Sequence, residues 1–574
     1  MYIKPEDRPI GKENFETAIA VGKGPKDGVS RRDFLIGTVA AGAVSGAGLG
    51  AMYFGYDKSM ENPVRIGFIG TGDEGSVLIG AHTPSYVQCV AIADIRPYNI
   101  HRAFHGDYSS DNAFQARPGL MAKYGWSSEE EARKQVKVYE NYKDLLKAVE
   151  NKELDLEGVV ISLPLHLHAE AAILAMKAGL HVLTEKLMAR TVAQCKEMGR
   201  VAKQTGKYLA TGHQRHYSIL YDNAIHTIKN GLLGDLHHIR AQWHRAKDTW
   251  QPPLPGDEAL VKQMASVKRR ITDAEKAKKP AEVEKWRRFL VQIQKQVEDK
   301  AVDAAFYGYQ EKRLPGGYHV SPIEELIRWR LWERTGGGLM AELGSHQLDA
   351  AGIFCTAARN DGEKALPLTV QATGGRHLYE EDRECEDHVY CMYEYPGPKY
   401  EEDNNKKIVV TYSSINGSPF GDYGECVMGT DRTLVLLKEQ EAMIFDNAGP
   451  ATKIDVSKAD TLDTTASGGG AAIGKAAMEA GPISRGYTEE MEHWAWCIRN
   501  PSAENQPRCH PKVALADAVI ALTTNIAIRN PEHSRIEFKK EWFDIDSDET
   551  PELAYLEDAK YKVTLDRAEY KPKA

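Results

Sequence analysis

The chain has 574 residues, of which 42% are apolar and 27% charged, a composition typical of a soluble globular protein with several domains. The formal net charge of −9 excludes a general attraction to nucleic acid or to anionic membranes, so we expect no nucleic-acid partner. The eight cysteines follow no regular spacing and include no Cys-x-x-Cys pair, which argues against a disulfide framework and against a zinc site.

An export signal is predicted within residues 1–62. The segment SRRDFL, residues 30–35, leads into 23 uncharged residues, 34–56, of which eleven are Gly or Ala. Paired arginines before an apolar run are typical of twin-arginine signals; the alternative is a chance Arg-Arg before a Gly/Ala-rich linker. We expect the twin-arginine machinery to deliver the protein to the periplasm. If the segment is not cleaved, it is long enough to anchor the protein in the inner membrane.

A glycine-rich turn follows the first apolar strand. Residues 64–70, VRIGFIG, lead into the sequence Gly70-Thr71-Gly72-Asp73-Glu74-Gly75. In a dinucleotide-binding turn the first glycine permits the tight bend, the second lets a pyrophosphate approach, and the third lets the helix pack on the strand. The helix N-terminus then offers free N–H groups to the phosphates. The turn therefore predicts a nicotinamide dinucleotide site.

The second strand ends at Asp94, nineteen residues after Gly75. An acid at this place accepts hydrogen bonds from the adenosine ribose, and it favours NAD over NADP because a carboxylate repels a 2′-phosphate. Arg96 leaves NADP open, since its guanidinium could bind that phosphate. The alternative for Arg96 is a solvated side chain beside Pro97.

Strand and helix patterns alternate over residues 63–213, which predicts a doubly wound parallel sheet. One buried strand in this region, LHVLTEK, ends in Glu185-Lys186. Open α/β sheets hold their ligands at the carboxyl ends of such strands, so Lys186 is a candidate for chemistry.

Several motifs in this order resemble the glucose–fructose oxidoreductase/inositol dehydrogenase/MocA family: GFIGTGDEG, AIADIRP, ISLPLHLHAEAAILAMKAGLHVLTEK, TGHQRHY and, at residues 336–351, GGGLMAELGSHQLDAA. The resemblance covers residues 63–545. It implies a Rossmann domain, 63–213, and an α+β domain, 214–545, with an open, mostly antiparallel sheet, followed by a tail, 546–574. In the family the outer face of that sheet often mediates oligomers, so we expect a dimer or tetramer.

The resemblance also assigns catalytic roles. Lys186 matches a lysine near the nicotinamide that polarises the reacting oxygen or acts as a base. His346 matches the histidine that moves the hydroxyl proton, and Glu342, four residues earlier, is expected on the same helix face, where it would orient the imidazole or relay its proton. Asp349 is a candidate for binding sugar hydroxyls.

Further residues are assigned by their position in these motifs. We expect the cofactor to contact Leu163, Pro164, His166, His168, Glu185 and Gln214, and the substrate to contact Arg215. Arg330, in the segment RWRLWERTGGG just before the catalytic glycines, is a further candidate for substrate contact, because a guanidinium suits the acidic or hydroxyl groups of a carbohydrate. His166 and His168 have metal-like spacing, but a place beside the nicotinamide favours a ring-facing or capping role. The run CEDH, residues 385–388, lacks a partner cluster, so the sequence predicts no metal site.

Three positions depart from the family pattern. Leu187 replaces the proline that usually stiffens the turn after Lys186, Glu342 replaces aspartate, and His216 stands where a second arginine is common. These changes affect the shape of the pocket and the aim of Lys186, and they remove no acid–base group.

The catalytic segments are separated by a charged insertion, residues 248–318. Lys186 and His346 lie 160 positions apart, about double the family spacing. Helically spaced apolar residues form two stripes within it, Leu260, Met264, Val267, Ile271 and Val283, Trp286, Phe289, Ile293, Val297, and Pro280 is placed to open the second helix. We expect a helical hairpin packed on the second domain; the alternatives are a lid or an oligomer contact. The Gly/Ala-rich stretch 466–481 is expected to form a loop near the pocket.

Two functions fit these features. The first is an oxidoreductase that passes hydride from a sugar, sugar acid or polyol to NAD, with NADP as an alternative cofactor. The second is a glycoside-cleaving enzyme that oxidises the ring transiently and ends with no net redox change. A cofactor-binding sensor without catalysis is disfavoured because Lys186, Glu342 and His346 are all present. Export favours tightly bound cofactor, since free nicotinamide nucleotide is scarce outside the cytoplasm.

Overall fold

A computed structural model describes residues 3–21, 51, 54–57, 60–246, 250–449 and 485–556. The arginine pair of the predicted export signal, most of the apolar run after it, the stretch 466–481 and the last eighteen residues, 557–574, lie outside the described residues.

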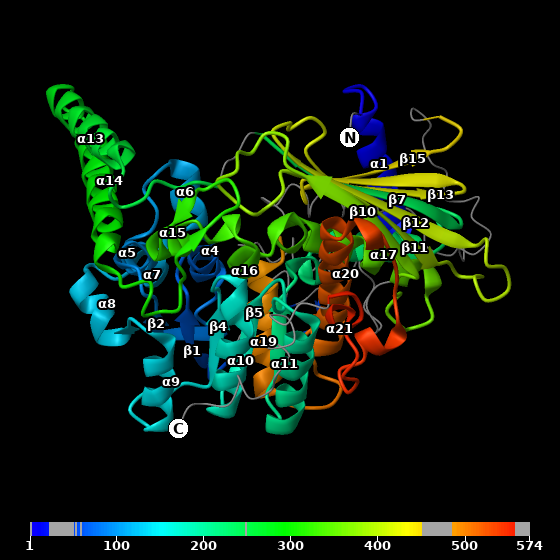
Figure 1. The fold of residues 1–574 in the computed structure, drawn as a ribbon, viewed down its shortest axis with the longest axis horizontal. Coiled ribbons are helices and arrows are strands. Elements are labelled where there is room, and N and C mark those ends of the chain that lie inside the picture. Colours follow the sequence, from blue (N-terminus) through cyan, green and yellow to red (C-terminus); the bar gives the residue numbers. More distant parts are fainter. Residues whose placement is uncertain are drawn as a thin grey trace.

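The first domain is built on a six-stranded parallel sheet in the order β3-β2-β1-β4-β5-β6, with helices on both faces (Figure 1). All four residues of β4 are buried, as expected for a central strand covered on both sides. The strands are β1 Val64–Ile69, β2 Val87–Ala93, β3 Lys137–Tyr139, β4 Gly158–Ile161, β5 His181–Glu185 and β6 Leu209–Gly212. The helices are α4 Asp73–Ala81, α5 Pro97–His105, α6 Asp111–Ala116, α7 Gly119–Tyr124, α8 Glu129–Gln135, α9 Tyr142–Glu150, α10 His168–Lys177 and α11 Val192–Thr205. The prediction of a doubly wound sheet is confirmed.

The second domain contains an eight-stranded sheet in the order β15-β14-β13-β7-β12-β11-β10-β16. Only the pair β7 and β12 is parallel, so the predicted open, mostly antiparallel sheet is confirmed. Its strands are β7 Leu236–Arg245, β10 Thr369–Gly375, β11 His388–Pro396, β12 Lys407–Asn416, β13 Tyr423–Gly429, β14 Arg432–Leu437, β15 Glu441–Asp446 and β16 Arg535–Glu537. Residues of β12 alternate between buried and half-buried, which is the period-2 pattern of a sheet with one face on the core.

Two long helices, α17 Ser345–Arg359 and α20 Pro511–Arg529, cover the inner face of this sheet. Among the described residues α20 is the one helix long and apolar enough to cross a membrane, yet 78% of its most apolar window is buried, as in a core helix. The remaining elements are α1 Arg8–Val21, which packs on β15, α12 Ile219–Lys229, α15 Pro322–Ile327, α16 Glu333–Gly336, α19 Tyr487–Arg499, α21 Pro551–Tyr555 and the short strands β8 Lys312–Arg313 and β9 His319–Val320.

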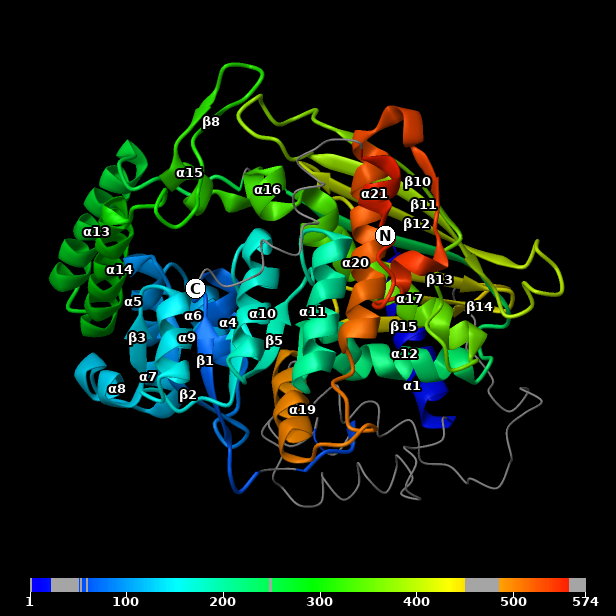
Figure 2. The same cartoon turned by 60° about the horizontal axis from the view of Figure 1, so that its bottom comes forward.

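Helix α19 returns from the second half of the chain to the first domain, where it lies beside β1 and β5 (Figure 2). Trp494 on α19 is fully buried against β4, and a side chain at Gly158 would come within 2.7 Å of its ring. The glycine in the central strand is therefore explained by a residue more than three hundred positions away. The chain therefore passes between the two domains more than twice.

The insertion forms a hairpin of α13 Glu258–Lys276 and α14 Pro280–Glu298, which projects from the molecule in Figure 1. Both predicted stripes meet between the helices, with Leu260, Val267, Phe289 and Ile293 buried. The expectation that the hairpin packs on the second domain is wrong, because α14 packs on α5 of the first domain. Buried polar contacts explain this docking: Gln292 donates a hydrogen bond to Asp107 at 2.9 Å and accepts one from the backbone N–H of Tyr108 at 2.8 Å.

Candidate active site

The order of the first sheet reverses between β1 and β4, and this switch point opens a crevice at the carboxyl ends of the strands. The turn after β1 requires its glycines. Gly70 has φ +82°, and a Cβ there would lie 2.4 Å from the carbonyl oxygen of Ser162. A Cβ at Gly75 would lie 2.2 Å from the carbonyl oxygen of Gly70. The turn thus brings the N-terminus of α4 close against the crevice, where a phosphate would bind.

Asp94 lies at the end of β2 and is 8% exposed. Its carboxylate accepts hydrogen bonds from the backbone N–H groups of Thr71 at 2.8 Å and Arg96 at 2.9 Å. The acid therefore joins the glycine turn to the start of α5. Since it also lines the crevice, it stands where an adenosine ribose would end.

The side chain of Arg96 is held by the insertion. Its Nε and Nη2 both lie 2.8 Å from Oδ2 of Asp299, a carboxylate with no exposed side-chain surface just after α14. The other oxygen, Oδ1, accepts a hydrogen bond from the backbone N–H of Tyr98 at 3.0 Å. An arginine paired in this way is not free to meet a 2′-phosphate, which agrees with the expected preference for NAD.

A cavity of about 1380 Å³ extends from this turn to the second domain. Most of the residues predicted for the site line it: Gly70, Gly72, Asp73, Glu74, Asp94, Arg96, Leu163, Pro164, His166, His168, Glu185, Lys186, Arg330, Glu342 and His346. The insertion also contributes lining residues that the sequence did not indicate, among them Trp250, Gln296, Phe306, Tyr307 and Tyr309. The insertion thus closes one side of the cofactor end.

Five predicted residues do not line the cavity: Thr71, Gly75, Gln214, Arg215 and Asp349. Thr71 and Gly75 belong to the glycine turn but do not face the cavity. Arg215 is buried and donates to Glu439 at 3.0 Å, and Asp349 is buried and hydrogen-bonded to His216 at 2.9 Å. Both side chains lie behind the wall of the cavity and support it in this structure.

Lys186 projects from the end of β5 into the cavity. Its Nζ donates a hydrogen bond of 2.7 Å to the backbone carbonyl of Glu342, which connects the two domains. The peptide bond between Lys186 and Leu187 is cis. His168 lies behind this turn, and its ring nitrogens meet the carbonyl oxygens of Leu187 and Leu163 at 2.9 and 2.7 Å. The histidine therefore holds the lysine turn to the end of β4, which is the capping role expected for it.

The carboxylate of Glu342 contacts Arg330, whose Nε donates to it at 2.9 Å. Although burial acts to raise it, the charges of Arg330 and Lys186 lower the pKa of Glu342 to about 2. No hydrogen bond joins Glu342 to His346 among the described residues, because the carboxylate is engaged by Arg330 instead. Residues Met340–Gly344, which carry the acid, form a π-helical turn before α17. Arg330 is thereby a partner of the acid.

His346 is 9% exposed and lines the cavity, with its ring centroid 5.4 Å from that of Trp243. Among the described residues its imidazole has no hydrogen-bond partner. Burial, followed by the positive charge of Lys186, holds the pKa of His346 well below its usual range. A neutral imidazole facing a cavity can accept a proton from a hydroxyl group.

A buried acid lies beside the lysine. Burial and, after it, the nearby carboxyl group of Glu74 together raise the pKa of Glu185 to about 8. The backbone N–H of Lys186 donates to Glu185 at 3.1 Å.

Arg485 donates to Glu439 at 2.8 Å and also lines the cavity. Arg485 follows the stretch 466–481, and no motif in the sequence pointed to it.

Comparison with known proteins gives a match over residues 64–213 to an oxidoreductase family with an NAD-binding Rossmann fold, GFO_IDH_MocA. A glycosyl hydrolase family 109 protein of Solibacter usitatus is 30% identical over 225 residues, which are 38% of this chain and 46% of that protein. D-glucoside 3-dehydrogenase of Escherichia coli is 25% identical over 183 residues, 32% of this chain and 43% of that protein. The matched part of the chain thus spans less than half of either relative. An inositol dehydrogenase homologue from Azotobacter vinelandii, solved with NAD+, has a TM-score of 0.49 and 13% identity, covering 83% of this chain and 98% of that one.

Proposed function

We propose that the protein oxidises a hydroxyl group of a sugar, sugar acid or polyol, because its first domain matches an oxidoreductase family with an NAD-binding Rossmann fold. Bound NAD would supply the hydride acceptor. The proposal rests on one observation above all: the glycine turn, Asp94, Lys186 and His346 face a single cavity. A relative named D-glucoside 3-dehydrogenase adds support for the substrate class.

The residues of the cavity would have distinct roles in the reaction. His346, neutral and buried, is the group suited to accept the hydroxyl proton. Lys186, fixed through Nζ to the carbonyl of Glu342, is placed to donate a hydrogen bond to the substrate oxygen. The ion pair of Arg330 and Glu342 stands beside them and offers a guanidinium group to a hydroxyl or carboxylate of the substrate.

We further propose that NAD stays bound between turnovers. The insertion supports this. Tyr307, Tyr309 and Gln296 form part of the cavity wall at its cofactor end, and Asp299 accepts a hydrogen bond from the guanidinium of Arg96. Tight binding suits a protein exported by the twin-arginine machinery to the periplasm, where it would carry its cofactor from the cytoplasm. An uncleaved leader would anchor it there.

A second candidate function is redox-neutral cleavage of a glycoside through transient oxidation of its ring. The observation in its favour is the similarity to a glycosyl hydrolase family 109 protein over 225 residues. In this function His346 and Lys186 would keep the same roles. The oxidised ring would lose the aglycone by elimination, water would add in its place, and a bound nicotinamide cofactor would supply the hydride that reduces the ring again.

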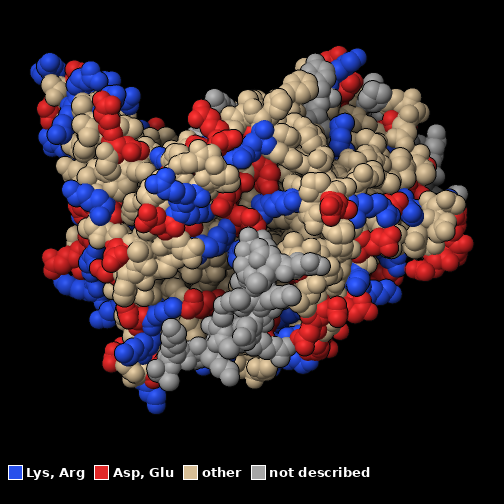
Figure 3. Space-filling model, viewed as in Figure 1, with Lys and Arg blue, Asp and Glu red and all other residues tan. Residues whose placement is uncertain are grey.

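We propose that the protein forms a dimer or tetramer through the outer face of the eight-stranded sheet. Tyr390 and Met392, two residues apart on β11 and so on one face of the strand, are 44% and 43% exposed, and apolar groups gathered on one exposed face suit a contact with a second copy. On the face of the molecule in Figure 3 acidic and basic side chains are interspersed.

The first experiment is to purify the exported protein, denature it and measure the absorbance of any released nucleotide. An empty protein would contradict tight binding. A screen of sugars, sugar acids and aryl glycosides then separates the functions. Stoichiometric NADH from added NAD indicates a simple dehydrogenase, whereas aglycone release without NADH indicates the redox-neutral enzyme. In either case Lys186→Met should abolish turnover, and Lys177→Met, at an exposed position on α10, should not. Full activity in Lys186→Met would defeat both functions.

A further inference from the structure

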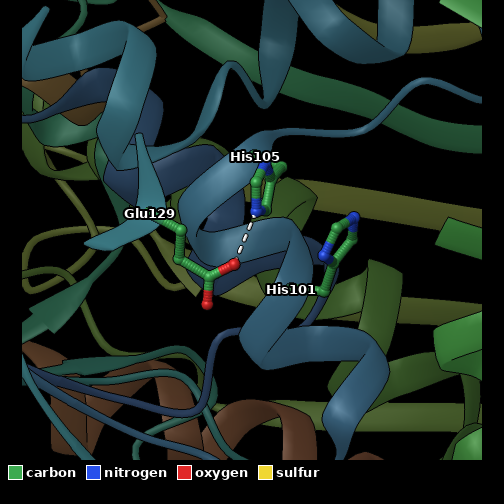
Figure 4. A group of neighbouring side chains, drawn as sticks. All are labelled: His101, His105 and Glu129. Carbon is green, nitrogen blue, oxygen red and sulfur yellow. Dashed lines mark hydrogen bonds and ion pairs between the residues drawn. The ribbon is translucent and has the colours of Figure 1, made fainter. Parts of the chain in front are cut away.

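A cluster of three side chains that can bind a metal lies on the surface of the first domain, away from the cavity. His101 and His105 are four residues apart on α5, and Glu129 is the first residue of α8 (Figure 4). The two imidazole rings are stacked, with centroids 4.3 Å apart and planes inclined by 23°. One nitrogen of each ring and one carboxylate oxygen lie within 4.8 Å of one another. The cluster therefore presents two nitrogens and one oxygen to a common point.

The two oxygens of Glu129 have different neighbours. Oε1 accepts a hydrogen bond from Nε of Arg133 at 2.6 Å, whereas Oε2 faces the histidines and lies 2.8 Å from Nε2 of His105. Arg133 thus orients the carboxylate without occupying the oxygen that faces the rings. Figure 4 shows the carboxylate directed toward the space between both imidazoles.

We propose that His101, His105 and Glu129 bind a divalent transition-metal ion, with zinc as the representative ion. Two imidazoles at i, i+4 on a helix and a carboxylate are a common ligand set for Zn²⁺, which takes nitrogen at about 2.0–2.1 Å and carboxylate oxygen at about 2.0–2.2 Å. Tetrahedral ligands at such distances lie about 3.3 Å apart. The observed separations, from 2.8 Å to less than 4.8 Å, bracket this value.

The surroundings allow the small adjustment that coordination needs. All three residues are partly exposed, so their side chains can rotate without disturbing the core, and water can fill the fourth position. The site joins α8 to α5, the helix on which α14 of the insertion packs. A bound ion would hold together the platform of the hairpin and would stabilise the native state, because the unfolded chain does not bring the three groups together.

The test uses the untagged full-length protein, treated with a chelator and titrated with ZnCl₂ by isothermal calorimetry. We expect one saturable site, with an affinity lowered by more than about tenfold in His105→Gln, since loss of a direct ligand costs at least as much as loss of the group that orients it. The matched control is His319→Gln. His319 also contacts a carboxylate, that of Glu311 at 2.7 Å, but is not part of any three-residue cluster found among the described residues. This control should bind zinc as the wild type does.

Thermal unfolding gives a second readout. Excess zinc should raise the midpoint of the wild type and of His319→Gln, and should raise that of His105→Gln less. If His105→Gln does not fold, Glu129→Gln tests the same ligand set. The absence of saturable binding would overturn the proposal, and so would binding that neither His105→Gln nor Glu129→Gln weakens.

Discussion

Replacing Asp299 by Asn should change the cofactor preference from a position in the insertion. Oδ1 of the new side chain can still accept from the N–H of Tyr98, but the amide nitrogen at the place of Oδ2 would face two N–H donors of Arg96. The guanidinium, 14% exposed, would be expelled toward the cavity that it already lines. A hydrogen bond between charged partners contributes about 1.5–3 kcal/mol. We therefore expect Asp299→Asn to bind NADP+ roughly tenfold to 150-fold more tightly than the wild type does, at about 1.4 kcal/mol for each factor of ten.

The assay is equilibrium binding of NAD+ and NADP+ to protein freed of bound nucleotide, with the ratio of the two dissociation constants as the result. Asp94 opposes the 2′-phosphate equally in both proteins, so its repulsion cancels from the comparison. Asp111→Asn is the control, because Asp111 pairs with Lys285 on the exposed side of the same hairpin. An unchanged ratio in Asp299→Asn would refute the reasoning. So would a gain that persists when Arg96 is also replaced by Met.

Three further predictions concern the turn, the proton acceptor and the core. Gly75→Ala should weaken NAD binding by more than about tenfold, because its Cβ would lie 2.2 Å from the carbonyl oxygen of Gly70, whereas Gly256→Ala, with open space around it, should bind NAD normally. His346→Gln should lower kcat by about 10²–10⁴ and leave NAD binding intact; a kcat within twofold of the wild type would exclude it as the base. Burial raises the pKa of Glu425 from 4.5 to about 7, so its contribution to stability is complete below pH 4.5 and is lost as the pH rises to 7. Between pH 5 and pH 8 the free energy of unfolding, measured with denaturant, should therefore fall less in Glu425→Gln than in the wild type, by at most about 3 kcal/mol. An identical fall in both proteins would contradict the assignment.

The parts of the site that depend on local backbone geometry could be predicted from the sequence. A glycine turn between a buried strand and a helix admits few conformations, so Gly70, Gly75 and the acid at the end of the next strand could be placed without tertiary contacts. Lys186 could be placed for the same reason, since the end of a parallel strand faces the crevice wherever the sheet forms. The helical stripes of the insertion followed from periodicity alone.

The partners of these residues could not be predicted. The carboxylate of Glu342 pairs with Arg330, although the sequence spacing indicated His346. The insertion docks on α5 because of buried hydrogen bonds to Gln292, and no pattern within the hairpin specifies them. The metal-binding cluster is similar: the pair in NIHRAFH is visible in the sequence, but Glu129 reaches it only through the packing of α8.

The sequence by itself thus determined the two-domain architecture, the cofactor turn and part of the cavity lining, including Lys186 and His346. Only the tertiary structure decided which charged groups pair, where the insertion packs, and that Arg96 is held by Asp299. The physical reason is the range of the interactions. Strand, turn and helix preferences act between neighbours in the chain, whereas ion pairs and buried hydrogen bonds depend on which surfaces meet when separate elements pack together.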